Sequence, residues 1–266
     1  MERKDMPVVH VFAKVVPDVA ALEHDPATLS PRLDTAPRKI GEADQVALEA
    51  GVRVKEMFGG EVVVLSAGYE LSEALLREAL AMGADKCFYV NDASLASADS
   101  WVTANVLAAL SARAGPAQLY LCGEASSDYS NYQIGPRLAE RLGFPCITHV
   151  TQLELSGDTV RAVRTLEDRV QMVEVEAPVV VSVGLELAQP RLPSLLMIRA
   201  ASRKPLTRVE LGELGLSADE LTPRLSRISL KVAKSARRNV TLTGDPRECA
   251  ATLIDHLVRE GVLQAR

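Results

Sequence analysis

The chain has 266 residues, of which 47% are hydrophobic and only 4% aromatic, and its formal net charge is −5. This length allows one large or two small domains, and the aliphatic composition is typical of a parallel α/β sheet. The acidic balance argues against a nucleic-acid partner, and no apolar run approaches the roughly 18 residues that span a bilayer, so direct membrane insertion is not expected.

The first half of the chain alternates between strand-like and helix-like segments. Short apolar runs predict strands over 8–15, 61–66, 86–90 and 119–122. Apolar residues at helical spacing predict helices over 41–58, 71–82, 99–112 and 131–142. The polar, proline-dotted segment 17–37 is expected to be a loop. This alternation predicts an α/β fold, a Rossmann-like parallel sheet with helices on both faces.

The pattern changes after Pro145. Four short strand-like runs, 146–155, 159–166, 170–175 and 179–183, indicate an antiparallel strand addition to the parallel sheet. A proline-rich loop follows at 189–194, and the polar segment after Arg203 is expected to leave the globular body. A last amphipathic helix is expected over 246–262. We therefore expect a nucleotide-binding domain at 1–203 and a partner-binding arm with its helix at 204–266.

Motifs for stand-alone catalysis are missing. The sequence has no GxSxG, HExxH, Walker lysine loop or GxGxxG, and its four cysteines and four histidines lack metal-ligand spacing. We therefore expect no catalytic residue and no metal, and any reaction would depend on a cofactor. Scattered cysteines without CxxC spacing favour free thiols in a reducing cytoplasm.

The most informative stretch is LYLCGEASSDYSNYQIGP at 119–136. It predicts a buried strand, a turn at Gly123, a polar loop and a helix beginning near Tyr132. Loops of this kind at the carboxyl ends of parallel strands hold phosphates, because a helix N-terminus offers free N–H groups. The alternative is that Asp128 and Asn131 only cap the helix, with Asn131 as its N-cap.

Several motifs in a fixed order resemble the beta subunit of electron-transfer flavoproteins, over nearly the whole chain. They are AKVVPD at 13–18, DQVALEA at 44–50, ALAMGAD at 79–85, DSWVTA at 99–104, the loop at 123–136, AVRTLEDR at 162–169 with APVVV at 177–181, and PRLPSL at 190–195. Each motif alone is weak, whereas their order and spacing are specific.

The resemblance implies a subunit of a heterodimeric electron carrier. Its partner would be a flavin-carrying alpha subunit, and FAD would be held mainly with that subunit. The loop at 190–195 would meet dehydrogenases or other redox partners through Pro190, Arg191 and Leu195. The cofactor-binding residues would be Ala13, Lys14, Ala67, Gly68, Thr103, Gly123, Asp128, Ser130, Asn131, Gln133 and Gly135.

The identity of the nucleotide stays open. The family usually begins its first helix with Asn-Pro, where this chain has Gly41-Glu42, and Ser130 stands where a second acid is usual. Either AMP or a second FAD would fit, the latter in a bifurcating member that oxidises NADH. A different class of protein, a stand-alone adenine-nucleotide sensor, is a further alternative, which the arm after Arg203 argues against.

Overall fold

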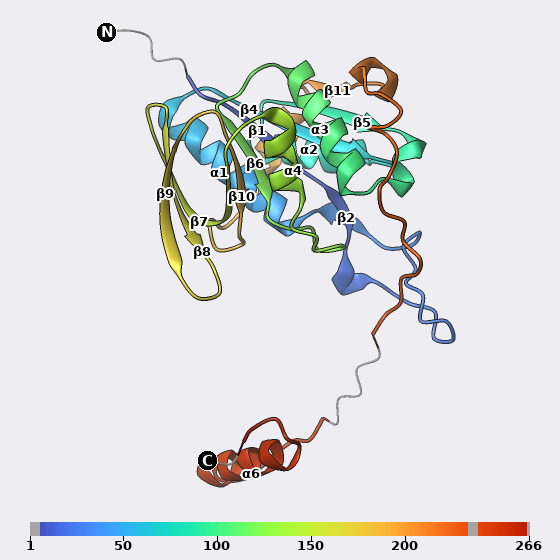
Figure 1. Cartoon of the computed structure of the whole chain (residues 1–266), viewed down its shortest axis with the longest axis vertical. Coiled ribbons are helices and arrows are strands. Elements are labelled where there is room, and N and C mark those ends of the chain that lie inside the picture. The colour runs from blue at the N-terminus through green and yellow to red at the C-terminus, as the bar shows by residue number, and fades with distance from the viewer. Residues whose placement is uncertain (1–5, 234–238, 265–266) are drawn as a thin grey trace. The chain divides into compact units, whose positions relative to one another are not determined.

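The computed structural model describes residues 6–233 and 239–264 (Figure 1). The chain divides into two compact units, one ending at Leu230 and the other beginning at Lys231. The first unit holds all the strands of the described residues. They are β1 (Val8–Phe12), β2 (Val15–Pro17), β3 (Arg38–Ile40), β4 (Glu61–Gly68), β5 (Lys86–Asn91), β6 (Leu119–Gly123), β7 (Cys146–Ser156), β8 (Thr159–Thr165), β9 (Val170–Glu176), β10 (Val179–Val183) and β11 (Leu206–Arg208).

Helices alternate with these strands along the chain. The α-helices are α1 (Glu42–Phe58), α2 (Glu73–Ala81), α3 (Ser100–Ala114), α4 (Ile134–Leu142), α5 (Leu195–Ala201) and α6 (Pro246–Arg259). Short 3-10 helices are η1 (Val19–Ala21), η2 (Ala93–Ser97) and η3 (Leu211–Leu214). The predicted α/β alternation is confirmed, and α5, η3 and β11 are additions that the sequence pattern did not indicate.

The central sheet has the strand order β11-β5-β4-β1-β6-β10-β7-β8-β9 within the described residues. All neighbours from β11 to β7 run parallel, and only β7, β8 and β9 pair antiparallel. The run at 179–183, expected in the antiparallel addition, is instead the parallel strand β10 between β6 and β7. Its five residues are all buried, because both faces of this strand are covered.

Helices cover both faces of the parallel part of the sheet (Figure 1). One apolar cluster joins Val9, Val11, Val62 and Val64 to buried side chains of α1 and α2. The other joins Phe12, Val63 and Leu65 to side chains of α3 and α4. Alternate residues of one strand thus enter opposite layers, as the period of a strand requires.

The segment after Arg203 was expected to leave the globular body, but residues 204–230 belong to the first unit. β11 pairs with β5, and Leu211, Leu214, Leu216 and Leu221 pack against the α3–α4 layer. The second unit carries α6, capped by Asp245, whose carboxylate accepts the N–H of Arg247 at 2.9 Å. No residue of α6 is buried, and Leu253 and Ile254 are exposed.

Candidate nucleotide site and docking loop

The strand register brings the predicted site residues to one edge of the sheet. Phe12 of β1 lies beside Leu65 of β4 and Cys122 of β6, so the residues that follow these strands are neighbours. Ala13 donates its N–H to the Leu65 carbonyl at 2.9 Å. Ala13, Lys14, Ala67, Gly68 and Gly123 therefore all lie at the carboxyl edge, where parallel sheets bind ligands.

Asp44 of α1 ties this edge together, and the sequence analysis did not single it out. Its carboxylate accepts the backbone N–H of Lys14 at 2.8 Å and that of Gly123 at 2.9 Å. Burial raises the pKa of Asp44 to about 6, against the two N–H bonds that lower it. Gly123 is 79 residues away from Asp44 in the chain, so no local sequence pattern predicts this contact.

Lys14 and Asp128 come together from the ends of β1 and the loop after β6. The Lys14 ammonium lies 2.7 Å from the Asp128 carboxylate, and it also lies 4.7 Å from the centre of the Tyr129 ring. The Asp128 side chain is mostly covered, whereas that of Lys14 is 42% exposed. A cation therefore stands at the sheet edge with a carboxylate as its present partner.

The loop between β6 and α4 is longer than predicted. The helix begins at Ile134, with Gln133 as its N-cap, so the expected cap at Asn131 is wrong. Ser130 and Tyr132 have positive φ angles of 47° and 56°, which delay the helix because αR geometry needs negative φ. Asn131 is exposed between them.

Gln133 and Thr103 have partners within the chain. The Gln133 amide oxygen accepts the Ser100 hydroxyl and, at 3.2 Å, Nε of Arg137. The Thr103 hydroxyl donates to the Asp99 carbonyl at 2.8 Å. Asp99 caps α3 by accepting the N–H of Val102 at 3.0 Å. A ligand that used either side chain would have to displace or share these bonds.

Residues 224–227 cross from the start of α3 to the loop after β6. Asp99 accepts the backbone N–H groups of Arg224 and Leu225 at 2.7 and 3.0 Å. The Arg227 guanidinium donates to the Tyr129 hydroxyl and lies 5.8 Å from its ring centre. This crossing segment connects two elements that carry predicted cofactor-binding residues, Thr103 on α3 and Asp128 in the loop after β6.

The three predicted glycines allow close packing within the chain. A Cβ on Gly123 would lie 2.6 Å from Cβ of Ala43, and one on Gly135 would lie 3.0 Å from Cβ of Ser182. A Cβ on Gly68 would meet Leu71 at 3.2 Å. At Gly123 the space belongs to α1, so this glycine lets the helix approach the strand, and its predicted role towards a ligand stays a prediction.

Ser66 was not among the predicted cofactor-binding residues. It is the residue before Ala67 near the end of β4, it is fully buried, and its hydroxyl has no hydrogen-bond partner within the described residues. A buried hydroxyl without a partner is costly, which makes it a candidate contact for a bound molecule.

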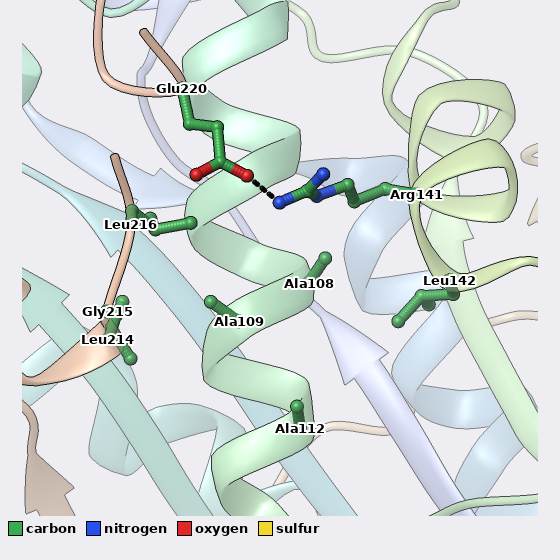
Figure 2. A pocket seen from close by; sticks show the side chains of 9 residues that line it. All are labelled: Ala108, Ala109, Ala112, Arg141, Leu142, Leu214, Gly215, Leu216 and Glu220. Carbon is green, nitrogen blue, oxygen red and sulfur yellow. Dashed lines mark ion pairs between the residues drawn. The ribbon is translucent and has the colours of Figure 1, made fainter. Parts of the chain in front are cut away.

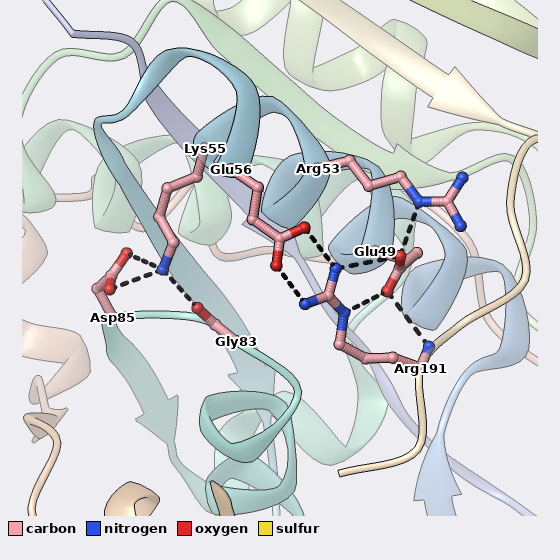
Figure 3. Close-up of polar contacts among 7 residues, drawn as sticks. All are labelled: Glu49, Arg53, Lys55, Glu56, Gly83, Asp85 and Arg191. Atoms are coloured by element: carbon pink, nitrogen blue, oxygen red, sulfur yellow. Dashed lines mark hydrogen bonds and ion pairs between the residues drawn. The ribbon is translucent and has the colours of Figure 1, made fainter.

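The predicted docking residues separate in the structure. Leu195, the first residue of α5, is 85% exposed, and Leu192 is 93% exposed. Arg191 instead turns towards α1, where its guanidinium pairs with Glu49 and Glu56 (Figure 3). Pro190 and Pro193 border a hollow of about 510 Å³ beside this loop.

A second hollow, of about 360 Å³, lies away from the sheet edge (Figure 2). Alanines 108, 109 and 112 of α3 form its floor, and Leu216 lies on one side. An ion pair between Arg141 of α4 and Glu220 closes one end. No pattern in the sequence indicated this hollow.

Two kinds of feature are missing from residues 6–233 and 239–264. Among them, no group of three or more His, Cys, Asp or Glu side chains is placed to hold a metal ion. Over the same residues, every helix is too short or too polar to cross a membrane.

The fold and the sheet edge define a class, the α/β proteins whose parallel strands carry polar loops at their carboxyl ends. A family model, the electron transfer flavoprotein domain, matches residues 33–214. A protein of Thermoanaerobacterium thermosaccharolyticum called electron transfer flavoprotein subunit beta is 34% identical over 93% of this chain and 96% of its own. The chain belongs to the electron-transfer flavoprotein beta-subunit family.

Two further relatives have similar coverage. The electron transfer flavoprotein subunit beta of Bacillus subtilis is 34% identical over 83% of this chain and 86% of its own. The caffeyl-CoA reductase-Etf complex subunit CarD of Acetobacterium woodii is 33% identical over 79% of this chain and 80% of its own. The family predicted from the motifs is thereby confirmed.

Proposed function

We propose that this chain is the beta subunit of a heterodimeric electron carrier that works with a flavin-carrying alpha subunit. The observation that carries this proposal is the near full-length similarity to a protein named as such a beta subunit. The exposed Leu253 and Ile254 of α6 support it, because an amphipathic helix without buried residues needs an apolar partner surface. FAD would accept electrons from a dehydrogenase and pass them on.

The sheet edge is our proposed site for an adenine nucleotide. Lys14 supplies a cation for a phosphate, and the unpartnered Ser66 hydroxyl supplies a donor at the neighbouring strand end. A phosphate would compete with Asp128 for the Lys14 ammonium, which lies 2.7 Å away. Asp128, being anionic, would then order the loop or accept a sugar hydroxyl, and the backbone N–H groups near Gln133 would face the phosphates.

A second candidate is the bifurcating activity, with another FAD in place of AMP. The similarity to CarD, whose name places it in a caffeyl-CoA reductase complex, favours this candidate. The small side chains at Ala13, Ala67 and Gly68 would leave room for a flavin ring. NADH would then be the reductant of that flavin.

One experiment separates the two candidates. The chain is co-expressed with its alpha subunit, and flavin and AMP are both assayed in an extract of the purified heterodimer. A flavin ratio of about one with stoichiometric AMP supports the simple carrier, whereas about two without AMP supports the bifurcating member. A colourless complex, or a chain that saturates with flavin alone, would contradict the whole proposal.

A pair of lysine variants tests the nucleotide site. Lys14→Met should lower the nucleotide content of the heterodimer at least about tenfold, since a phosphate loses its cation. Lys86→Met is the control, because Lys86 begins β5 at the opposite edge and pairs with Glu61 at 2.7 Å. Equal nucleotide content in both variants would exclude Lys14 as a phosphate contact.

The docking loop has its own test. Leu195→Ala should slow the reduction of the flavin by a reduced dehydrogenase about tenfold or more, because an exposed apolar anchor can carry much of a small interface. Reduction by dithionite should not change, since dithionite needs no protein interface. Unchanged rates with both reductants would remove Leu195 from the interface.

A further inference from the structure

The segment from Pro190 to Ala201 carries an exposed apolar surface. Leu192, Leu195, Leu196 and Ile198 are 93, 85, 78 and 51% exposed. Leu192 lies in the loop before α5, and the other three side chains lie on α5. Apolar side chains at a protein surface normally turn towards the protein. These four side chains stay in contact with water, so other residues must hold the segment in place. We call this segment, 190–201, the docking segment.

Arg191 holds the first end of the docking segment (Figure 3). Its Nε lies 2.8 Å from Glu49, and its Nη1 lies 2.6 Å from Glu56, which follows Glu49 by about two turns of α1. Its backbone N–H also donates to Glu49 at 3.2 Å. One residue thus binds the helix through both its side chain and its main chain.

The carboxylate that receives Arg191 is itself nearly inaccessible. The Glu49 side chain is 4% exposed. Burial alone would raise the pKa of Glu49, but the bonds from Arg191 and Arg53 outweigh it and the pKa lies below its ordinary value. Glu49 is therefore a fixed anion, and the planar guanidinium bridges it to Glu56 in a geometry that Lys cannot reproduce.

Two other cations hold the far end of the docking segment. Arg77 of α2 donates to the carbonyls of Ala201 and Ser202 at 3.2 and 3.3 Å. Lys204 donates to the carbonyls of Leu80 and Ala84 at 2.9 and 2.6 Å. The docking segment is thus fixed at both ends, and its four exposed apolar side chains lie between the two attachments.

We propose that Arg191 is a positioning residue for partner docking, which presets the docking segment by bridging Glu49 and Glu56 and does not itself contact the partner. This proposal rests on the proposed docking function. A segment that is already ordered loses less conformational entropy when a partner binds. We call the pairing of Arg191 with Glu49 and Glu56 the clamp. The clamp therefore favours association without adding a contact to the interface.

Hydrogen exchange measured on the full-length chain in its heterodimer tests the clamp directly. Arg191→Gln should speed amide exchange within the docking segment about tenfold, because a local opening no longer breaks the bridge to α1. Glu56→Gln should give a smaller increase of about threefold, since Glu56 is one of the two acceptors and is half-exposed. This milder variant keeps the test informative even if Arg191→Gln fails to fold.

Arg53→Gln is the matched control. Arg53 also pairs with Glu49, at 2.7 Å, but it belongs to α1, and within the described residues no hydrogen bond or ion pair joins it to the docking segment. Its loss should leave exchange within the docking segment at the wild-type rate. Wild-type exchange in Arg191→Gln, or equal acceleration in Arg53→Gln, would overturn the clamp.

A kinetic split tests the link to docking. With a reduced flavoprotein dehydrogenase that donates to the wild-type heterodimer, Arg191→Gln should raise KM several-fold while kcat and the dithionite rate stay unchanged. A fall in the dithionite rate would overturn the positioning role, because it would indicate general damage. If Leu195→Ala leaves KM unchanged, the docking function fails, and the exchange result still decides whether the clamp exists.

Discussion

Two loops follow neighbouring strands of the same sheet edge and differ in where their side chains find partners. The loop after β6 turns its charged group inward, where Asp128 pairs with Lys14 of the adjacent strand end. The segment after β10 turns its arginine inward and its leucines outward. The charged group of the first loop has its partner within the same chain, whereas the second loop presents an apolar surface that another molecule would have to cover.

This difference separates two kinds of sites. A loop with internal polar partners must exchange those partners for a ligand, so its affinity depends on competition with Asp128. A loop with exposed apolar side chains gains by burial alone, provided its backbone is already held. Substitutions in the two loops, and in the helices that hold the first loop, test this contrast.

The largest expected effect is at the base of the first loop. Gly123→Ala would place a Cβ 2.6 Å from Cβ of Ala43 and 2.7 Å from Oδ1 of Asp44. Helix α1 would have to shift, so we expect urea unfolding of the full chain to show a loss of about 3 kcal/mol or more. The control Gly212→Ala meets nothing within 4 Å, and its change should stay within about 0.5 kcal/mol. Similar losses in both variants would contradict the packing role of Gly123.

Asp44 predicts a pH effect with a definite sign. Its pKa is raised from 3.8 to about 6 in the folded chain, so the folded state holds the proton more tightly between these values. The resulting stabilisation is full below pH 3.8 and is lost as the pH rises through 6. Between pH 7.5 and pH 4.5 the wild type should therefore gain about 2 kcal/mol over Asp44→Asn in urea unfolding.

The control for Asp44 is Asp34→Asn, because Asp34 is exposed. Its unfolding free energy should run parallel to that of the wild type over the same pH range. A parallel profile for Asp44→Asn as well would show that the Asp44 proton is not held more tightly in the folded chain.

Much of the fold follows from local sequence patterns. The remaining parts depend on contacts between residues that are distant in the chain. Strands β1, β4, β5 and β6 and helices α1 to α3 carry clear apolar patterns, so they were predicted to within a few residues. The three residues of β11 and the seven of α5 are too short for any period to show. β10 looks like any apolar strand, and only its pairing with β6 reveals its direction.

The candidate site shows the same limit. Polar composition singles out Asp128 and the residues around it, but it does not reveal that Ser130 and Tyr132 adopt positive φ angles. Asp44 looks like any first-turn acid of a helix, a place where anions are favoured anyway. Its real partners are fixed by packing at Gly123, which only the folded chain brings near.

A smaller effect distinguishes a true helix cap from the expected one. Asp99→Ala should cost about 1 kcal/mol or more in urea unfolding, because Asp99 caps α3 and also holds the backbone of Arg224 and Leu225. Asn131→Ala should change the unfolding free energy by less than about 0.5 kcal/mol, since Asn131 is exposed and α4 begins only at Ile134. A loss of about 1 kcal/mol in Asn131→Ala would instead indicate that Asn131 caps the helix, as expected from the sequence.

The smallest effect is expected at the tip of the second loop. Leu192 is 93% exposed, so folding removes almost none of its surface from water, and Leu192→Ser should change the unfolding free energy by no more than about 0.3 kcal/mol. Leu138→Ser is the control, because Leu138 is fully buried in the α3–α4 layer, and its loss should exceed about 3 kcal/mol. A clear loss of stability in Leu192→Ser would mean that this leucine folds back into the neighbouring hollow, and the docking segment would then no longer present it to a partner.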